Sequence, residues 1–104
     1  MFDVYYRSLS KEQRNEFSEK CGLSQDTIKN TYMAKDPLKR RMPKPETMVA
    51  FIKHSGGALN IIGIMDYFHV ATMVELMKLD NMPEQKIRHS LSIFHPANYP
   101  EYVE

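Results

Sequence analysis

The cluster of side chains best suited to chemistry consists of four polar residues close together in the sequence: Gln25, Asp26, Lys29 and Asn30. On a helix running from about residue 25 to residue 33, Ile28 and Tyr32 are four residues apart and face inward, which leaves these four side chains exposed. Gln and Asn amides can form two hydrogen bonds with an adenine edge, and a Lys ammonium can donate to guanine. The cluster therefore has the chemistry to read base edges in a DNA groove.

A basic connector follows this helix. It contains five cationic residues: Lys35, Lys39, Arg40, Arg41 and Lys44. Pro37, Pro43 and Pro45 each disfavour helix at the preceding residue, so the segment is expected to be a loop. Beside a DNA groove these cations would add affinity that does not depend on base sequence.

Charge is distributed unevenly along the 104 residues, although the formal net charge is only +1. Residues 1–57 contain 11 Lys and Arg against 7 Asp and Glu, whereas residues 58–104 contain 3 against 6. The halves therefore carry +4 and −3. Two interpretations of this asymmetry stay open: the N-terminal half meets a polyanion, or the charge difference is ordinary surface variation.

The elements that position the polar cluster are predicted from caps and apolar spacing. A first helix stops near Ser8 and has one apolar face, formed by Phe2, Tyr5, Tyr6 and Leu9. Ser10 begins a second helix as N-cap, with Gln13 completing a capping box, and Gly22 ends it. Its inner face is predicted to contain Gln13, Phe17, Ser18 and Cys21. Ser24 is the expected N-cap of the helix that carries the polar cluster.

Later elements are predicted with decreasing detail. Pro45 fits the first turn of a fourth helix, which Gly56 and Gly57 close and whose apolar face is Met48, Val49, Phe51 and Ile52. Residues 58–70 leave helix and strand open. Residues 71–79 favour helix, with Val74, Met77 and the flanking Met73 and Leu76 as apolar positions. Asn81 is the expected N-cap of a last helix from Pro83 to about Phe94, followed by an extended tail to Glu104.

The spacing of Ser18, Gly22, Leu23 and Ile28 supplies what two steeply crossing helices need, namely a small contact residue, a turn glycine and apolar inner faces. This stretch resembles the helix-turn-helix of the lambda Cro and phage-repressor superfamily, in which Gly-Val-Ser-Gln-x-x-Ile is a frequent core. The resemblance covers roughly residues 10–57. Residues 44–48 and 54–58 also resemble the helix that follows the recognition helix in small Cro-like prophage regulators.

The resemblance implies a five-helix DNA-binding domain that binds its operator as a dimer, with the helix from Gln25 in the major groove. Gln25, Asp26, Lys29 and Asn30 would then face bases, and Ser24 and Thr27 would lie near phosphates. Two features depart from the family pattern. Asp26 places an acid near the groove, where it must accept from a cytosine amine or stay clear of phosphate. The loop of residues 34–43 is also longer than usual.

The predicted fold class is all-α, a Cro/repressor-like helix-turn-helix domain with a mainly helical C-terminal extension. Residues 1–60 would form the DNA-binding region, and residues 61–104 would complete a single compact domain and build a homodimer. The expected function is sequence-specific transcriptional regulation of the prophage type, most readily repression. The alternative is a protein-interaction module, such as an antitoxin or antirepressor partner, acting through the C-terminal half.

Other functions find little support in the sequence. The histidines show no ligand spacing with acids, so no metal or cofactor is expected; they are His54, His69, His89 and His95. Cys21, the single cysteine, falls on a packed helix face and is expected to be a structural thiol. We find no catalytic motif. Without a long apolar run or a basic leader, a cytoplasmic protein with no membrane partner is expected.

Overall fold

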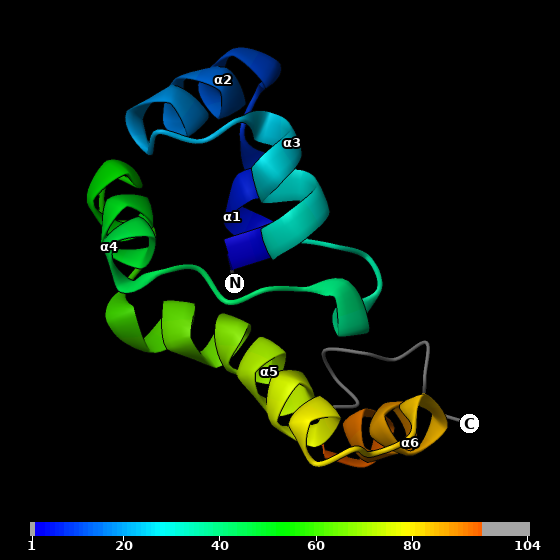
Figure 1. The fold of residues 1–104 in the computed structure, drawn as a ribbon. Helices are drawn as coiled ribbons and strands as arrows, with labels where there is room; N and C mark the ends of the chain where they lie inside the picture. Colours follow the sequence, from blue (N-terminus) through cyan, green and yellow to red (C-terminus); the bar gives the residue numbers. More distant parts are fainter. Residues whose placement is uncertain (1, 95–104) are drawn as a thin grey trace. The chain divides into compact units, whose positions relative to one another are not determined.

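The computed structural model describes residues 2–94, and all regular elements within them are helical (Figure 1). The predicted all-α class is therefore confirmed for this part of the chain, while the predicted tail of residues 95–104 lies outside it. The chain divides into two compact units, Met1–Ala71 and Thr72–Glu104. The division lies inside one helix.

The first unit contains three α-helices that match the predicted order: α1 (Phe2–Ser8), α2 (Lys11–Lys20) and α4 (Pro45–His54). Between α2 and α4 lie the short helix α3 (Gln25–Thr27), the π-helical turn η1 (Ile28–Tyr32) and the 3-10 turn η2 (Pro37–Lys39). Helix α5 (Ile61–Leu79) then begins in the first unit and crosses into the second.

Residues 58–70, for which the sequence did not decide between helix and strand, are helical from Ile61 onward. Asn60 precedes it, and its side-chain Oδ1 accepts a hydrogen bond from Gly63 N at 2.8 Å, as an N-cap does. Ile64 and Phe68, four residues apart, are buried, whereas Ile61 and Ile62 are exposed. The helical period is therefore present in the burial pattern, although the run of isoleucines conceals it in the sequence.

An aromatic core holds the first unit together, and Phe2 lies at its centre. The Phe2 ring is fully buried, with its centroid 4.7 Å from that of Phe51 and 5.4 Å from that of Phe68. The rings of Tyr6 and Phe17 also lie next to the Phe2 ring, with centroids 6.2 and 6.5 Å from its own. Aromatic side chains from α1, α2, α4 and α5 thus meet in one cluster, which orients all four elements.

Two predicted inner-face residues of the first unit are in fact exposed. Gln13 is exposed because its side chain turns back to the start of α2, where Oε1 accepts from Ser10 N at 2.8 Å. Val49 keeps 60% of its surface exposed, whereas Phe51 in the same helix is fully buried. Residues two apart lie about 200° apart around a helix axis, so α4 cannot bury both.

In the second unit, the end of α5 differs from the prediction. Asn81 was expected to cap the last helix, but its φ of 57° places it in the left-handed region just after α5. Asn81 N donates to Lys78 O and Met82 N donates to Met77 O, both at 3.0 Å, which is the paired pattern of a Schellman C-cap. Asn tolerates this conformation better than most residues do.

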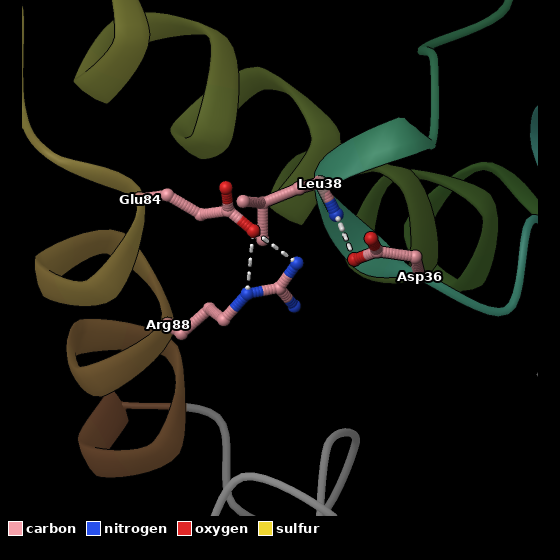
Figure 2. Close-up of polar contacts among 4 residues, drawn as sticks. All are labelled: Asp36, Leu38, Glu84 and Arg88. Carbon is pink, nitrogen blue, oxygen red and sulfur yellow. Dashed lines mark hydrogen bonds and ion pairs between the residues drawn. The ribbon is translucent and has the colours of Figure 1, made fainter.

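Helix α6 (Glu84–Phe94) begins after Pro83 and buries Ile87 and Leu91, four residues apart, as predicted. Arg88 and Glu84 form an ion pair one turn apart on its surface, with Nη2 and Oε1 separated by 2.6 Å (Figure 2). In the part of α5 that belongs to this unit, Val74 is buried, whereas Leu76, a flanking apolar position of the predicted helix, is 60% exposed. Leu76 lies nearly opposite Val74 on the helix.

Replacing Phe2 by Ala should destabilise the protein by about 3–5 kcal/mol, because it opens a cavity where four helices meet. Urea unfolding followed by circular dichroism measures this loss. The matched control is Val4→Ala on the same short helix, since Val4 is 68% exposed and its truncation should change the free energy of unfolding by less than about 0.5 kcal/mol. Similar losses for both variants would show that α1 does not anchor the core.

Cys21 should react slowly with alkylating reagents in the folded protein. Burial raises the pKa of its thiol to about 11, from an ordinary value of 9.0, so at pH 8 the thiolate is about 100-fold scarcer than in the unfolded chain. Between these two values the unfolded thiol ionises first, and stability should therefore fall as pH rises. Iodoacetamide kinetics at pH 8, with and without urea, test this expectation. Equal rates would mean that Cys21 is not shielded.

Candidate nucleic-acid interface

Helix α2 is closed at both ends by local hydrogen bonds that the sequence predicts. Ser10 N donates to Gln13 Oε1 at 2.8 Å and Gln13 N donates to Ser10 Oγ at 3.1 Å, which completes the capping box. At the other end Gly22 has a φ of +71°, a conformation that a Cβ would strain. Leu23 N donates to Ser18 O at 2.9 Å across this turn. The chain is thus turned sharply before α3.

Ser24 caps α3 as predicted. Its Oγ accepts from Thr27 N at 3.0 Å and lies 2.8 Å from Thr27 Oγ1. The two hydroxyls, which the family resemblance places near phosphates, are therefore bonded to each other. Ser24 is exposed and Thr27 is half-buried.

The helix that begins at Gln25 continues to Tyr32, close to the predicted end, but its second part is a π turn. Met33 N donates to Ile28 O at 2.9 Å, so the bond spans five residues instead of four. Consequently Met33, five residues after Ile28, is buried with it. Tyr32, the predicted inward partner of Ile28, is half-buried, and its ring lies nearly perpendicular to the rings of Phe51 and Phe68, with centroids 6.0 and 6.3 Å away.

The four residues of the polar cluster differ in exposure. Asp26, Lys29 and Asn30 are exposed, while Gln25 is half-buried. The Gln25 Nε2 atom donates to Asn15 Oδ1 on α2 at 3.4 Å. Asn15 is a polar neighbour that sequence reasoning missed, and it links the first turn of α3 to the preceding helix.

The five connector cations do not act alike. Arg40 is half-buried: its Nε donates to Ala34 O at 2.6 Å, and its guanidinium lies 5.8 Å from the centroid of the Tyr67 ring. It therefore anchors the connector. Arg41 and Lys44 are exposed, and the backbone of Arg41 is tied to Thr31 O at 3.2 Å.

Lys35 and Lys39 lie on either side of Asp36, which begins the 3-10 turn η2. Asp36 Oδ1 accepts from Leu38 N at 3.1 Å (Figure 2). Pro37 and Leu38 of this turn are buried. The turn is thus fixed from within, and the two lysines on its outer side are exposed.

A basic groove of about 620 Å³ brings part of the polar cluster together with the connector. Lys29, Asn30, Lys35 and Lys39, all predicted DNA contacts, line it. Two further cations line it that sequence reasoning did not assign, Arg7 from α1 and Arg14 from α2. The other predicted contact residues do not line this groove: Ser24, Gln25, Asp26, Thr27, Arg40, Arg41 and Lys44.

The walls of the basic groove carry a strong positive charge. Its five cations face one lining carboxylate, that of Asp36. Arg14 is held in place by a 3.1 Å bond from Nε to Leu9 O and lies 6.0 Å from the centroid of the Tyr6 ring. Arg7 pairs loosely with Asp3 at 3.9 Å. The apolar residues that line the groove are Tyr6, Met33 and Ala34, and all three are nearly buried.

Among residues 2–94, no three His, Cys, Asp or Glu side chains gather closely enough to hold a metal ion. Nor does any helix in this range have the length and apolar character needed to cross a membrane.

Comparison with known proteins identifies no relative. No family model, no curated protein and no solved structure matches the chain. Its function is therefore inferred from the residues and geometry described above.

Proposed function

We propose that this protein is a sequence-specific DNA-binding transcriptional regulator, acting as a repressor, in which α2, the Gly22 turn and α3–η1 serve as a helix-turn-helix. One observation carries the proposal: the outer side of α3–η1 presents Asp26, Lys29 and Asn30 to solvent next to a groove lined by five cations. Base-reading groups and phosphate-binding groups are thus adjacent on one surface.

The proposed recognition helix is well anchored for this task. Ile28 and Met33 are buried in the core, and the Ser24 cap and the Gly22 turn fix where the helix starts. A rigid helix can place amide and ammonium groups in the major groove with little loss of conformational entropy. Gln25, held by Asn15, is partly oriented before DNA arrives.

Phosphate attraction would come mainly from exposed cations. Lys35 and Lys39 line the basic groove together with Lys29 and Asn30 of the recognition helix. Arg41 and Lys44 are exposed further along the connector and add positive charge there. The contribution of Arg40 is indirect, because its guanidinium already bonds Ala34 O. Asp26 disfavours close phosphate approach at the helix start and fits a cytosine amine.

A second candidate function is a protein-interaction module, such as an antitoxin or antirepressor partner. It is favoured by the exposed apolar side chains of α5, since Ile61 and Ile62 are 71% and 82% exposed and Met65 is also exposed. Exposed apolar clusters often mark protein contacts. A DNA mobility-shift assay with the DNA upstream of its own gene, set against co-purification of a bound partner protein, distinguishes the two candidates.

Truncating a base-reading side chain should weaken binding to the operator more than binding to other DNA. Gln25→Ala and Lys29→Ala should each reduce operator affinity by about 5- to 150-fold, the equivalent of about 1–3 kcal/mol for a base contact. The measurement is a titration at fixed salt against a duplex selected from a random pool and against a scrambled duplex. Lys29→Ala should also lose some affinity for the scrambled duplex, because it removes a charge.

The matched control for Gln25→Ala is Asn15→Ala, which breaks the same Gln25–Asn15 hydrogen bond but leaves the glutamine in place. It should lose much less operator affinity. Lys53→Ala controls for Lys29→Ala, since Lys53 is an exposed lysine on α4. Equal losses on both duplexes for Gln25→Ala would mean that α3–η1 is not the recognition helix.

The operator complex should contain two copies of the chain, because a two-fold operator is read by a two-fold dimer. Exposed apolar residues of α5 make a self-contact physically reasonable. Light scattering at micromolar concentration is expected to give twice the mass of one chain. A single-chain mass both alone and on the selected duplex would rule out the dimer.

A further inference from the structure

We propose that the basic groove is a binding site for a free nucleotide, that is, a small phosphate ester joined to a planar ring. The proposal that a nucleotide binds is argued only from the residues and volume of the basic groove and does not depend on the proposed function. A second step, competition between this ligand and DNA, rests on the proposed function.

The size and lining of the basic groove fit such a ligand. A volume of about 620 Å³ lies within the range of small-molecule sites, about 300–1,000 Å³. Tyr6, Met33 and Ala34 line the groove and expose only 5–8% of their surface, so they offer a small apolar patch to a ring, whereas Asn30 can hydrogen-bond a ring edge. A double helix is too wide to enter a hollow of this volume. The groove therefore suits one compact ligand.

The positive charge of the basic groove accounts for the phosphate part of the ligand. The groove has five cations, and two carboxylates offset them: Asp36, which lines the groove, and Asp3, which pairs with Arg7, so an excess of three positive charges remains. Within residues 2–94, no carboxylate forms an ion pair with Arg14, Lys29, Lys35 or Lys39. Such like charges repel one another and favour a bound polyanion. A diphosphate, with two or three negative charges, matches this excess.

The groups that would hold the phosphates come from separate parts of the first unit. Arg7 lies at the end of α1, Arg14 in the middle of α2, and Lys35 and Lys39 around η2. Arg14 is oriented in advance by Leu9 O and by the Tyr6 ring, so less entropy is lost when it binds a phosphate. A solvated helix face would not bring these four residues together.

The position of the basic groove gives the ligand a regulatory consequence. Lys29 and Asn30 line the groove and also belong to the proposed base-reading surface. A nucleotide bound there would engage both side chains and neutralise Lys35 and Lys39. Operator affinity should therefore fall when the site is filled.

The experiment is isothermal titration calorimetry, in which ADP is titrated into the protein at about physiological ionic strength. We expect one ADP per chain, with adenosine and pyrophosphate each binding at least about 10-fold more weakly, since each lacks half of the contacts. Pyrophosphate binding as tight as ADP would show an inorganic anion site and overturn the nucleotide assignment. Tighter binding of a short single-stranded oligonucleotide than of ADP would overturn the free-nucleotide assignment.

Variants locate the site. Lys35→Ala and Lys39→Ala should each weaken ADP binding by about 5- to 10-fold and should not lower the melting temperature of the free protein, because each relieves repulsion in the groove. Lys11→Ala, which removes an exposed cation of α2 that does not line the groove, should leave ADP affinity unchanged. The same loss in all three variants would mean diffuse charge attraction and would overturn the proposal.

A final comparison separates this site from the DNA-binding proposal. Gln25 does not line the basic groove, so Gln25→Ala should bind ADP normally while losing operator affinity. ADP binding without any duplex binding would support the groove and refute the DNA-binding function. Duplex binding that ADP cannot weaken, in a protein that binds ADP, would refute only the competition.

Discussion

Burial of the Phe2 ring is the interaction on which the rest of the first unit depends. Its neighbours Phe17, Phe51 and Phe68 come from α2, α4 and α5, so one side chain near the N-terminus joins elements that are far apart in the sequence. Helix α1 has only seven residues, too few to be stable alone, and is held by Phe2 and Tyr6. The cations on α1 and α2 are placed by this packing.

Local signals, namely capping hydrogen bonds, a turn glycine and a proline, then determine where α2, α3 and α4 begin and where α2 ends, and this part of the fold could be predicted from the sequence. The Ser10 capping box, the Gly22 turn, the Ser24 cap and the Pro45 start act within four residues of their own position. Errors arose where a residue type fits two roles. Asn81 suits an N-cap and a left-handed C-cap equally well, and only the chain path decides between them.

The candidate site was predictable only in part, for the same physical reason. Lys29, Asn30, Lys35 and Lys39 lie within one stretch, so their proximity follows from local structure. Arg7 and Arg14 reach the basic groove through tertiary packing, which no spacing rule encodes. Arg40, by contrast, resembles its neighbours in sequence but serves the fold, because Ala34 O and the Tyr67 ring are within its reach.

The π turn of η1 has a consequence for how this surface could change over evolution. A turn closed by a five-residue bond contains one residue more than an α turn, so deleting one residue between Ile28 and Tyr32 could restore a regular helix without disturbing the Ser24 cap. The side chains after the deletion would rotate about the axis relative to Gln25 and Asp26. The loss of a single codon could thus change the direction of the side chains in the second part of α3–η1, while the Ser24 cap and the buried Ile28 stay in place.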